Sequence, residues 1–93
     1  MRHATSPALD RLDGLLHALR GIAGLKEKSR GVFYRSGRAF LHFHEHDALL
    51  FADVRFGSDF ERWPVSRKGE QRLLLRKILA FSNDGKKNGR RTG

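Results

Sequence analysis

The amino-acid sequence predicts a single-domain α+β protein with the element order α-β-β-β-(β)-α. Two segments with helical periodicity lie near the ends of the chain, short strand-like runs with turn signals lie between them, and 93 residues suffice for one hydrophobic core. We expect an antiparallel meander sheet with both helices packed on one face, since a helix stripe and a sheet face each need an apolar partner. The predicted domain covers residues 1–81.

The first helix is predicted at residues 7–23. Ser6 followed by Pro7 is typical of a helix start. Apolar residues then recur at spacings of three and four, namely Leu9, Leu12, Leu16, Leu19 and Ile22. The stripe predicts an amphipathic helix, and the residues after Gly24 form a polar exit from it.

Three strands are predicted next, at residues 31–35, 38–44 and 49–56. Ser36-Gly37 is a hairpin-turn signal between the first two. A shorter fourth strand, marked as optional in the element order, is expected at residues 60–63.

A final helix begins near Ser66 and is expected to end at Asn83-Asp84-Gly85. Residues 82–93 are basic and rich in Gly and Asn, so we expect a disordered tail.

Strand alternation predicts the two faces of the sheet. With even-numbered turns, the core face holds Val32, Tyr34, Ala39, Leu41, Phe43, Leu50, Ala52, Val54 and Phe56. The open face holds Phe33, Arg35, Arg38, Phe40, His42, His44, Leu49, Phe51, Asp53 and Arg55. An odd second turn would bury Asp53 and Arg55, which the cost of burying charge disfavours.

The composition indicates what kinds of partner and site to expect. A net charge of +9 favours association with nucleic acid or another polyanion. The chain has no cysteine, which excludes disulfides and thiolate chemistry and fits a cytoplasmic protein. No apolar run is long enough to span a bilayer, so no membrane association is expected.

The open face predicts a binding surface. Phe33, Phe40 and Phe51 could stack on bases while neighbouring arginines contact phosphates, as on sheet-type single-strand binders. The arginines in question are Arg35, Arg38 and Arg55. Exposed aromatic side chains equally suit a homodimer interface, and both interpretations stay open.

A metal site is the alternative for the same face. His42 and His44, at i and i+2 of one strand, project together, and Asp53 is expected diagonally across from His42. Two histidines and a carboxylate are a ligand set for zinc or ferrous iron. A cross-strand hydrogen bond between His42 and Asp53 would explain the same residues without a metal, and nearby arginines oppose a cation.

The segment 37–56 also resembles the central hairpin of small bacterial proteins known as the luciferase-domain or luciferase family. The shared pattern is Gly37-Arg38-x-x-x-His42-x-His44, followed by Ala52-Asp53-Val54-x-Phe56. The resemblance implies Arg38, His42, His44 and Asp53 as matched positions and does not imply light-emitting chemistry.

Taken together, the sequence predicts a small basic binding module rather than an enzyme, with no cofactor. The alternative is a small metal-binding or catalytic protein that uses His42, His44 and Asp53.

Overall fold

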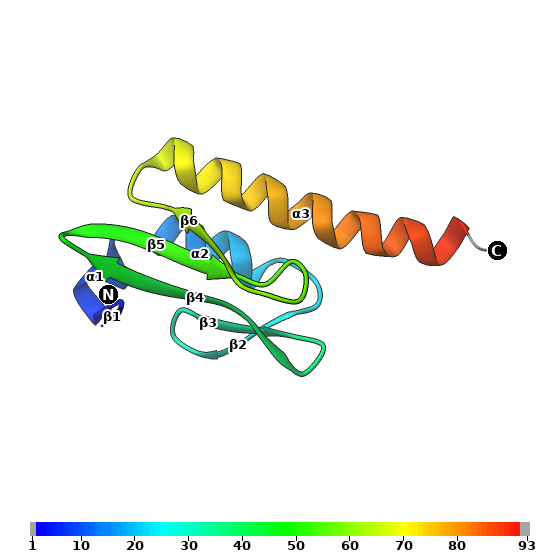
Figure 1. Cartoon of the computed structure of the whole chain (residues 1–93), viewed down its shortest axis with the longest axis horizontal. Coiled ribbons are helices and arrows are strands. Elements are labelled where there is room, and N and C mark those ends of the chain that lie inside the picture. Colours follow the sequence, from blue (N-terminus) through cyan, green and yellow to red (C-terminus); the bar gives the residue numbers. More distant parts are fainter. Residues whose placement is uncertain (1, 92–93) are drawn as a thin grey trace.

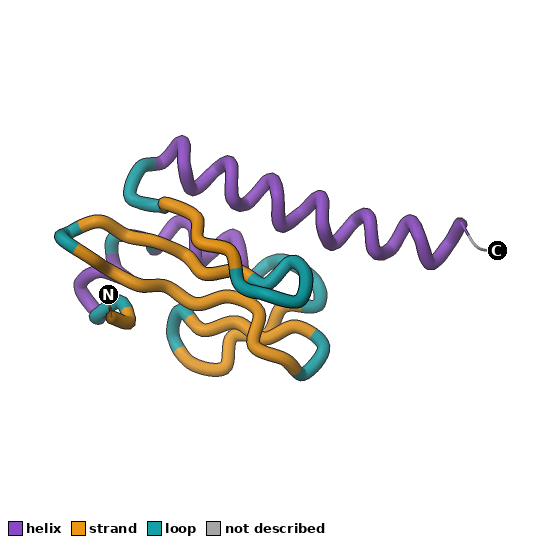
Figure 2. The backbone as a smooth tube through the Cα atoms, in the orientation of Figure 1, coloured by secondary structure: helices purple, strands orange, loops and turns teal. Residues whose placement is uncertain are grey.

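The fold is an antiparallel sheet with helices at both ends of the chain (Figures 1 and 2). In this computed structural model, the backbone is described for residues 2–91 and the side chains for residues 3–82. The elements in order are β1 (Arg2–His3), α1 (Ser6–Asp10), α2 (Asp13–Arg20), β2 (Leu25–Ser29), β3 (Val32–Arg35), β4 (Arg38–His46), β5 (Leu49–Val54), β6 (Glu61–Pro64) and α3 (Lys68–Arg91). Strands β2 to β6 are neighbours in sequence order, and β1 pairs with β4. The predicted α+β class and antiparallel meander are confirmed.

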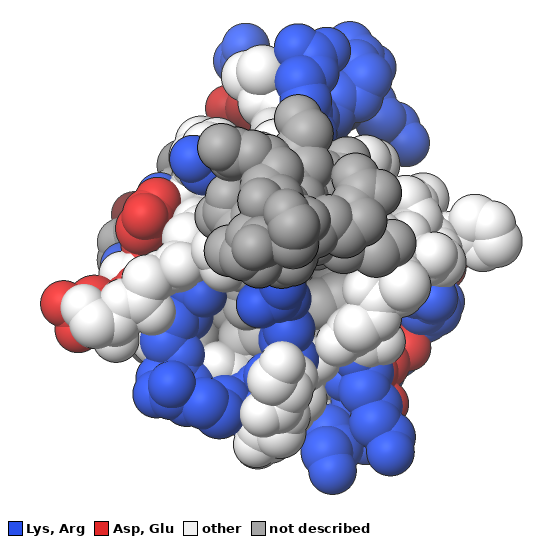
Figure 3. Space-filling model, turned by 90° about the vertical axis from the view of Figure 1, so that its right-hand side faces the viewer, with Lys and Arg blue, Asp and Glu red and all other residues white. Residues whose placement is uncertain are grey.

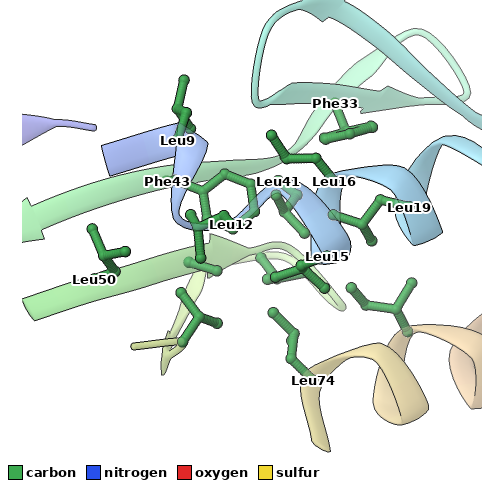
Figure 4. Close-up of a cluster of buried hydrophobic side chains, with 14 of the residues drawn as sticks. Leu9, Leu12, Leu15, Leu16, Leu19, Phe33, Leu41, Phe43, Leu50 and Leu74 are labelled. Atoms are coloured by element: carbon green, nitrogen blue, oxygen red, sulfur yellow. The ribbon is translucent and has the colours of Figure 1, made fainter. Parts of the chain in front are cut away.

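One hydrophobic core joins the helices to one face of the sheet (Figure 4). The helices contribute Leu9, Leu12, Leu15, Leu16, Leu19, Leu74 and Ile78, and the strands contribute Phe33, Phe40, Leu41, Phe43, Leu50, Ala52 and Val54. Burying a large aliphatic or aromatic side chain stabilises a fold by about 1.5–3 kcal/mol. Because the core uses only one face of the sheet, the other face is left for a site.

The helices differ from the predicted ones in their bounds. The expected helix at 7–23 is two shorter helices, α1 and α2, with a break at Arg11–Leu12, and the leucine stripe stays buried across the break. Helix α3 continues to Arg91, past the predicted end at 83–85. Asn, Asp and Gly lower helix propensity by about 1 kcal/mol or less each, which weakens a helix without forcing it to end.

The predicted domain boundary at residue 81 and the disorder of residues 82–93 stay predictions. The side chains beyond Ser82 and the backbone of residues 92 and 93 lie outside the described part of the chain. Within the described part, no helix is both long enough and apolar enough to cross a membrane.

Two strands were not predicted. Strand β2 forms in the polar segment that was expected to follow the first helix. Its exposed lysines alternate with the half-buried Leu25 and Glu27, as is typical of an edge strand with one face in solvent. Strand β1 has only two residues and carries no alternation to detect. The optional strand at 60–63 does form, as β6, with Pro64 at its end.

A β-bulge between β3 and β4 overturns part of the predicted face assignment. Tyr34 lies opposite Ala39 as expected, but Phe33 lies opposite Leu41, which leaves Phe40 as the extra residue. Phe33 and Phe40 are therefore buried, at 0% and 3% exposure, instead of lining the open face. Tyr34, expected in the core, is half-buried. One inserted residue reverses the alternation of the strand beyond it. Side chains of β3 beyond the bulge therefore point to the face opposite the predicted one.

The β4–β5 hairpin keeps the predicted faces with a shifted register. Asp47 and Ala48, with φ of 51° and 66°, form a two-residue turn with both central residues in the left-handed region. The even-numbered turn expected from the sequence is centred on His46-Asp47 and places His42 opposite Phe51. The observed pairing is moved by two residues, so that His42 lies opposite Asp53 and His44 opposite Phe51. A shift by two leaves every side chain on its expected face.

Candidate metal centre

Three histidines meet on the face of the sheet that carries no helix. Leu41 and Phe43 point into the core, so the alternation of β4 projects His42 and His44 to the other side. Strand β1 brings His3 beside them, because His3 pairs with His44 and the amide of Ala4 donates to the Phe43 carbonyl. The site therefore joins the N-terminal strand to the middle of the sheet.

The three imidazole rings are in contact. The ring centroids of His3 and His44 are 5.1 Å apart and stacked, those of His42 and His44 are 4.8 Å apart, and those of His3 and His42 are 5.7 Å apart. One candidate ligand nitrogen from each ring lies within 4.8 Å of the others. Nδ1 of both His42 and His44 is buried and has no hydrogen-bond partner among the described residues. Nitrogens in this arrangement can converge on one ion.

Asp53 lies behind the histidines and is held by Arg62. The Nε and Nη2 atoms of Arg62, on β6, donate to the two carboxylate oxygens of Asp53 at 2.9 and 3.1 Å. Oδ2 of Asp53 also lies 2.9 Å from Nε2 of His44, at ion-pair distance but without the alignment of a hydrogen bond. Asp53 is only 7% exposed. Its carboxylate is therefore a buried charge that is offset by an arginine.

The electrostatics of the site favour the neutral form of His42 and the ionised form of Asp53. Burial lowers the pKa of His42 below its ordinary value, and the neighbouring His44 and His3 act in the same direction against the attraction of Asp53. Burial alone would raise the pKa of Asp53, but the hydrogen bonds from Arg62 and the nearby positive charges lower it overall. Near neutral pH the half-buried imidazole of His42 consequently has a lone pair with which it can coordinate a metal ion.

One wall of the site is aromatic. The ring of Phe60, in the loop before β6, lies 5.0 Å from the ring of His42. The guanidinium of Arg55 lies 4.8 Å from the same Phe60 ring, and its Nε and Nη2 atoms donate to the carbonyl of Ala39. Phe60 and Arg55 thus flank the histidines with an apolar surface and a positive charge.

The predicted open-face residues fall into separate groups. His42, His44, Asp53 and Arg55 lie together, and half-buried Phe51 lies opposite His44 on the same face. Arg35 instead places its guanidinium 4.7 Å from the Phe81 ring of α3, on the helix side. Exposed Arg38 lies opposite Arg35 at the hairpin end, and the buried Phe33 and Phe40 belong to the core.

Three residues of the site were missed from the sequence. His3 precedes the first helix in a segment with no strand pattern, so nothing in the sequence placed it. Arg62 had a usable signal, because antiparallel pairing of the optional fourth strand would bring a basic residue opposite Asp53. Phe60 was assigned to that strand, whereas it belongs to the loop before it.

Comparison of the chain with protein-family models, curated proteins and solved structures finds no match. The likeness of residues 37–56 to the luciferase family thus stays a resemblance of one hairpin.

Proposed function

We propose that this chain is a metal-binding protein that holds a divalent transition-metal ion, Zn²⁺ or Fe²⁺, between His3, His42 and His44. The observation that carries the proposal is the convergence of three imidazoles from two strands, with candidate ligand atoms within 4.8 Å of one another. Neutral imidazole is a common ligand for both ions. In this ligand set His3 takes the position that sequence reasoning gave to Asp53.

The unpaired ring nitrogens support a ligand at this point. Leaving a buried polar atom without a partner costs about 1–3 kcal/mol, and Nδ1 of His42 and of His44 both lack one among the described residues. An ion coordinated through Nδ1 of both rings would satisfy these atoms directly. Asp53 stands beside Nε2 of His44, in the place of the outer carboxylate that commonly orients a metal-binding histidine.

The geometry needs a small contraction. A tetrahedral zinc ion with bonds of 2.0–2.1 Å requires ligand nitrogens about 3.3 Å apart, against separations of up to 4.8 Å here. His42 and His44 are half-buried on β4, whereas His3 is exposed on a two-residue strand. Rotation of the exposed His3 side chain can supply part of the closure, and as one of three ligands His3 should contribute strongly to metal affinity.

A zinc titration followed by the side-chain ¹⁵N signals of histidine tests the proposal. The signals of His3, His42 and His44 should shift together and saturate near one equivalent. His17, exposed on α2, serves as the internal control and should not move. Gradual shifts at large excess, or equal shifts at His17, would contradict a specific site.

A second proposal is that the basic surface binds a polyanion by charge, without a platform for base stacking. The net charge of +9 supports it, and Figure 3 shows Lys and Arg side chains around much of one end of the molecule. With Phe33 and Phe40 in the core, only Phe51 of the three expected stacking residues faces the open side. Fluorescence anisotropy with single-stranded RNA should therefore give weak binding that disappears steeply with salt. Tight binding that persists at high salt would contradict it.

Homodimer formation through the open face and a cytoplasmic location are also retained as proposals. Phe60 and Leu49, at 39% and 51% exposure, are the large apolar side chains that support a contact between two copies. Sedimentation at high protein concentration distinguishes a dimer from a monomer.

A further inference from the structure

We infer that a metal ion at the three histidines keeps one coordination position open and that this position takes the oxygen of a small anion, such as a carboxylate. The inference rests on the proposed metal site and names its ligand class. It follows from the number of ligands, the charge around them and the access to them.

Three protein side chains are available to coordinate the ion. Among the described residues, the group of converging ligand atoms consists of His3, His42 and His44 alone. Both oxygens of Asp53 accept hydrogen bonds from Arg62, and His46, further along β4, lies beside Asp47. Zinc sites with three protein ligands hold an exchangeable molecule in the fourth position.

The charge around the site favours an anion in that position. Three neutral imidazoles leave the two positive charges of the ion uncompensated. The nearest carboxylate, Asp53, already has its charge offset by Arg62, and Arg55 adds a further positive charge behind the ring of Phe60. A bound divalent cation is the largest local charge in such a site and attracts negative oxygen.

Access to the open position is on the side of His3 and Phe60. Both side chains are exposed, whereas His42 and His44 are half-buried and Asp53 is buried behind them. The Phe60 ring, 5.0 Å from that of His42, offers an apolar surface beside the ion. A ligand with one anionic oxygen and a short apolar body, which acetate represents, matches these surroundings.

Cobalt substitution provides the test, because tetrahedral Co²⁺ absorbs visible light in a way that depends on its ligands. The Co²⁺-loaded protein is titrated with acetate and with acetamide, a neutral molecule of similar size. Acetate should change the visible spectrum with saturation, and acetamide should bind at least about tenfold more weakly, a difference of about 1.4 kcal/mol. Arg55→Gln should weaken acetate binding several-fold, while Arg38→Gln, an exposed arginine at the hairpin end, should leave it unchanged.

The possible failures are distinct. If Co²⁺ binds at one equivalent but acetate and acetamide act alike, or neither changes the spectrum, the inference is overturned and the metal site stands. If Co²⁺ does not bind near one equivalent, the proposed function and the inference both fail. Since Arg55 also bonds to the Ala39 carbonyl, a poorly folded Arg55→Gln variant would leave the acetate and acetamide comparison in the unsubstituted protein as the deciding measurement.

Discussion

Asp53 and Arg62 form a two-point ion pair across β5 and β6, with donor–acceptor distances of 2.9 and 3.1 Å. The arginine side chain is half exposed while the carboxylate is almost inaccessible. This asymmetry means that the aspartate depends on the arginine more than the reverse, because an unpaired buried charge is costly. The pair therefore fixes one carboxylate next to His44, and among the described residues the converging ligand atoms are those of the three histidines, without Asp53.

Asp53→Asn should lower both stability and metal affinity. The substitution leaves the geometry of the strand intact but loses the ionic hydrogen bonds to Arg62, so the free energy of unfolding should fall by about 1–3 kcal/mol. Loss of a carboxylate behind a metal-binding histidine typically reduces metal affinity by about 10–100-fold. Urea unfolding and zinc titration measure the two effects. Unchanged zinc affinity in a folded Asp53→Asn protein would show that Asp53 does not support the site.

His3→Ala should separate metal binding from folding. The side chain is exposed on a two-residue strand, so the free energy of unfolding should change by about 0.5 kcal/mol or less. Zinc affinity should fall at least about tenfold, because one of three ligands is gone. Calorimetric titration checks this, with His17→Ala as a matched loss of an exposed histidine. Equal zinc affinity in the two variants would refute a role for His3.

Phe33→Ala and Phe40→Ala should each behave as core mutations. Removing a fully buried phenylalanine typically costs about 3–5 kcal/mol, and both side chains are at most 3% exposed. Phe60→Ala, on the exposed ring, should cost about 1 kcal/mol or less. Thermal or urea unfolding ranks the three variants. If Phe33→Ala were as stable as the unsubstituted protein, the bulge would be contradicted. Without the bulge, Phe33 would lie on the open face of the sheet, where its loss would cost little stability.

Stability should decrease as the pH falls, in two ranges. The pKa of Glu27 is lowered by its hydrogen bond from Arg20, and that of Asp53 is lowered overall despite its burial, so the unfolded chain binds these protons first. The stability that the carboxylates contribute is complete above their ordinary range and is lost as the pH drops through about 4.

His42 is responsible for the loss of stability in the upper pH range. Its pKa is lowered by burial from an ordinary value of 6.5, so between about pH 7 and 5 the unfolded chain takes up a proton that the folded chain does not. Urea midpoints measured from pH 8 to 3 test both ranges. His42→Gln should remove the upper decrease only, and a midpoint that rises between pH 7 and 5 would contradict the shift at His42.

The local sequence pattern determined the class of the fold and, for most helices and strands, which side is apolar. Leucines at helical spacing and alternation in residues 41–54 specify which side of each element is apolar, and those sides pack against one another in the observed core. The placement of His42, His44 and Asp53 on the side away from the helices followed from alternation together with the cost of burying Asp53, which selected an even-numbered turn. It survived the two-residue shift at Asp47-Ala48 because a shift by an even number preserves the faces.

Tertiary structure decided the composition of the site. Alternation relates only residues of one strand, so a single bulged residue at Phe40 was enough to move Phe33 from the expected open face into the core. His3 joins the cluster through a two-residue strand that is too short to carry a pattern. Arg62 donates hydrogen bonds to the Asp53 carboxylate because β6, a separate strand, pairs with β5. Such contacts between distant segments depend on which strands become neighbours, and the local sequence does not encode that choice.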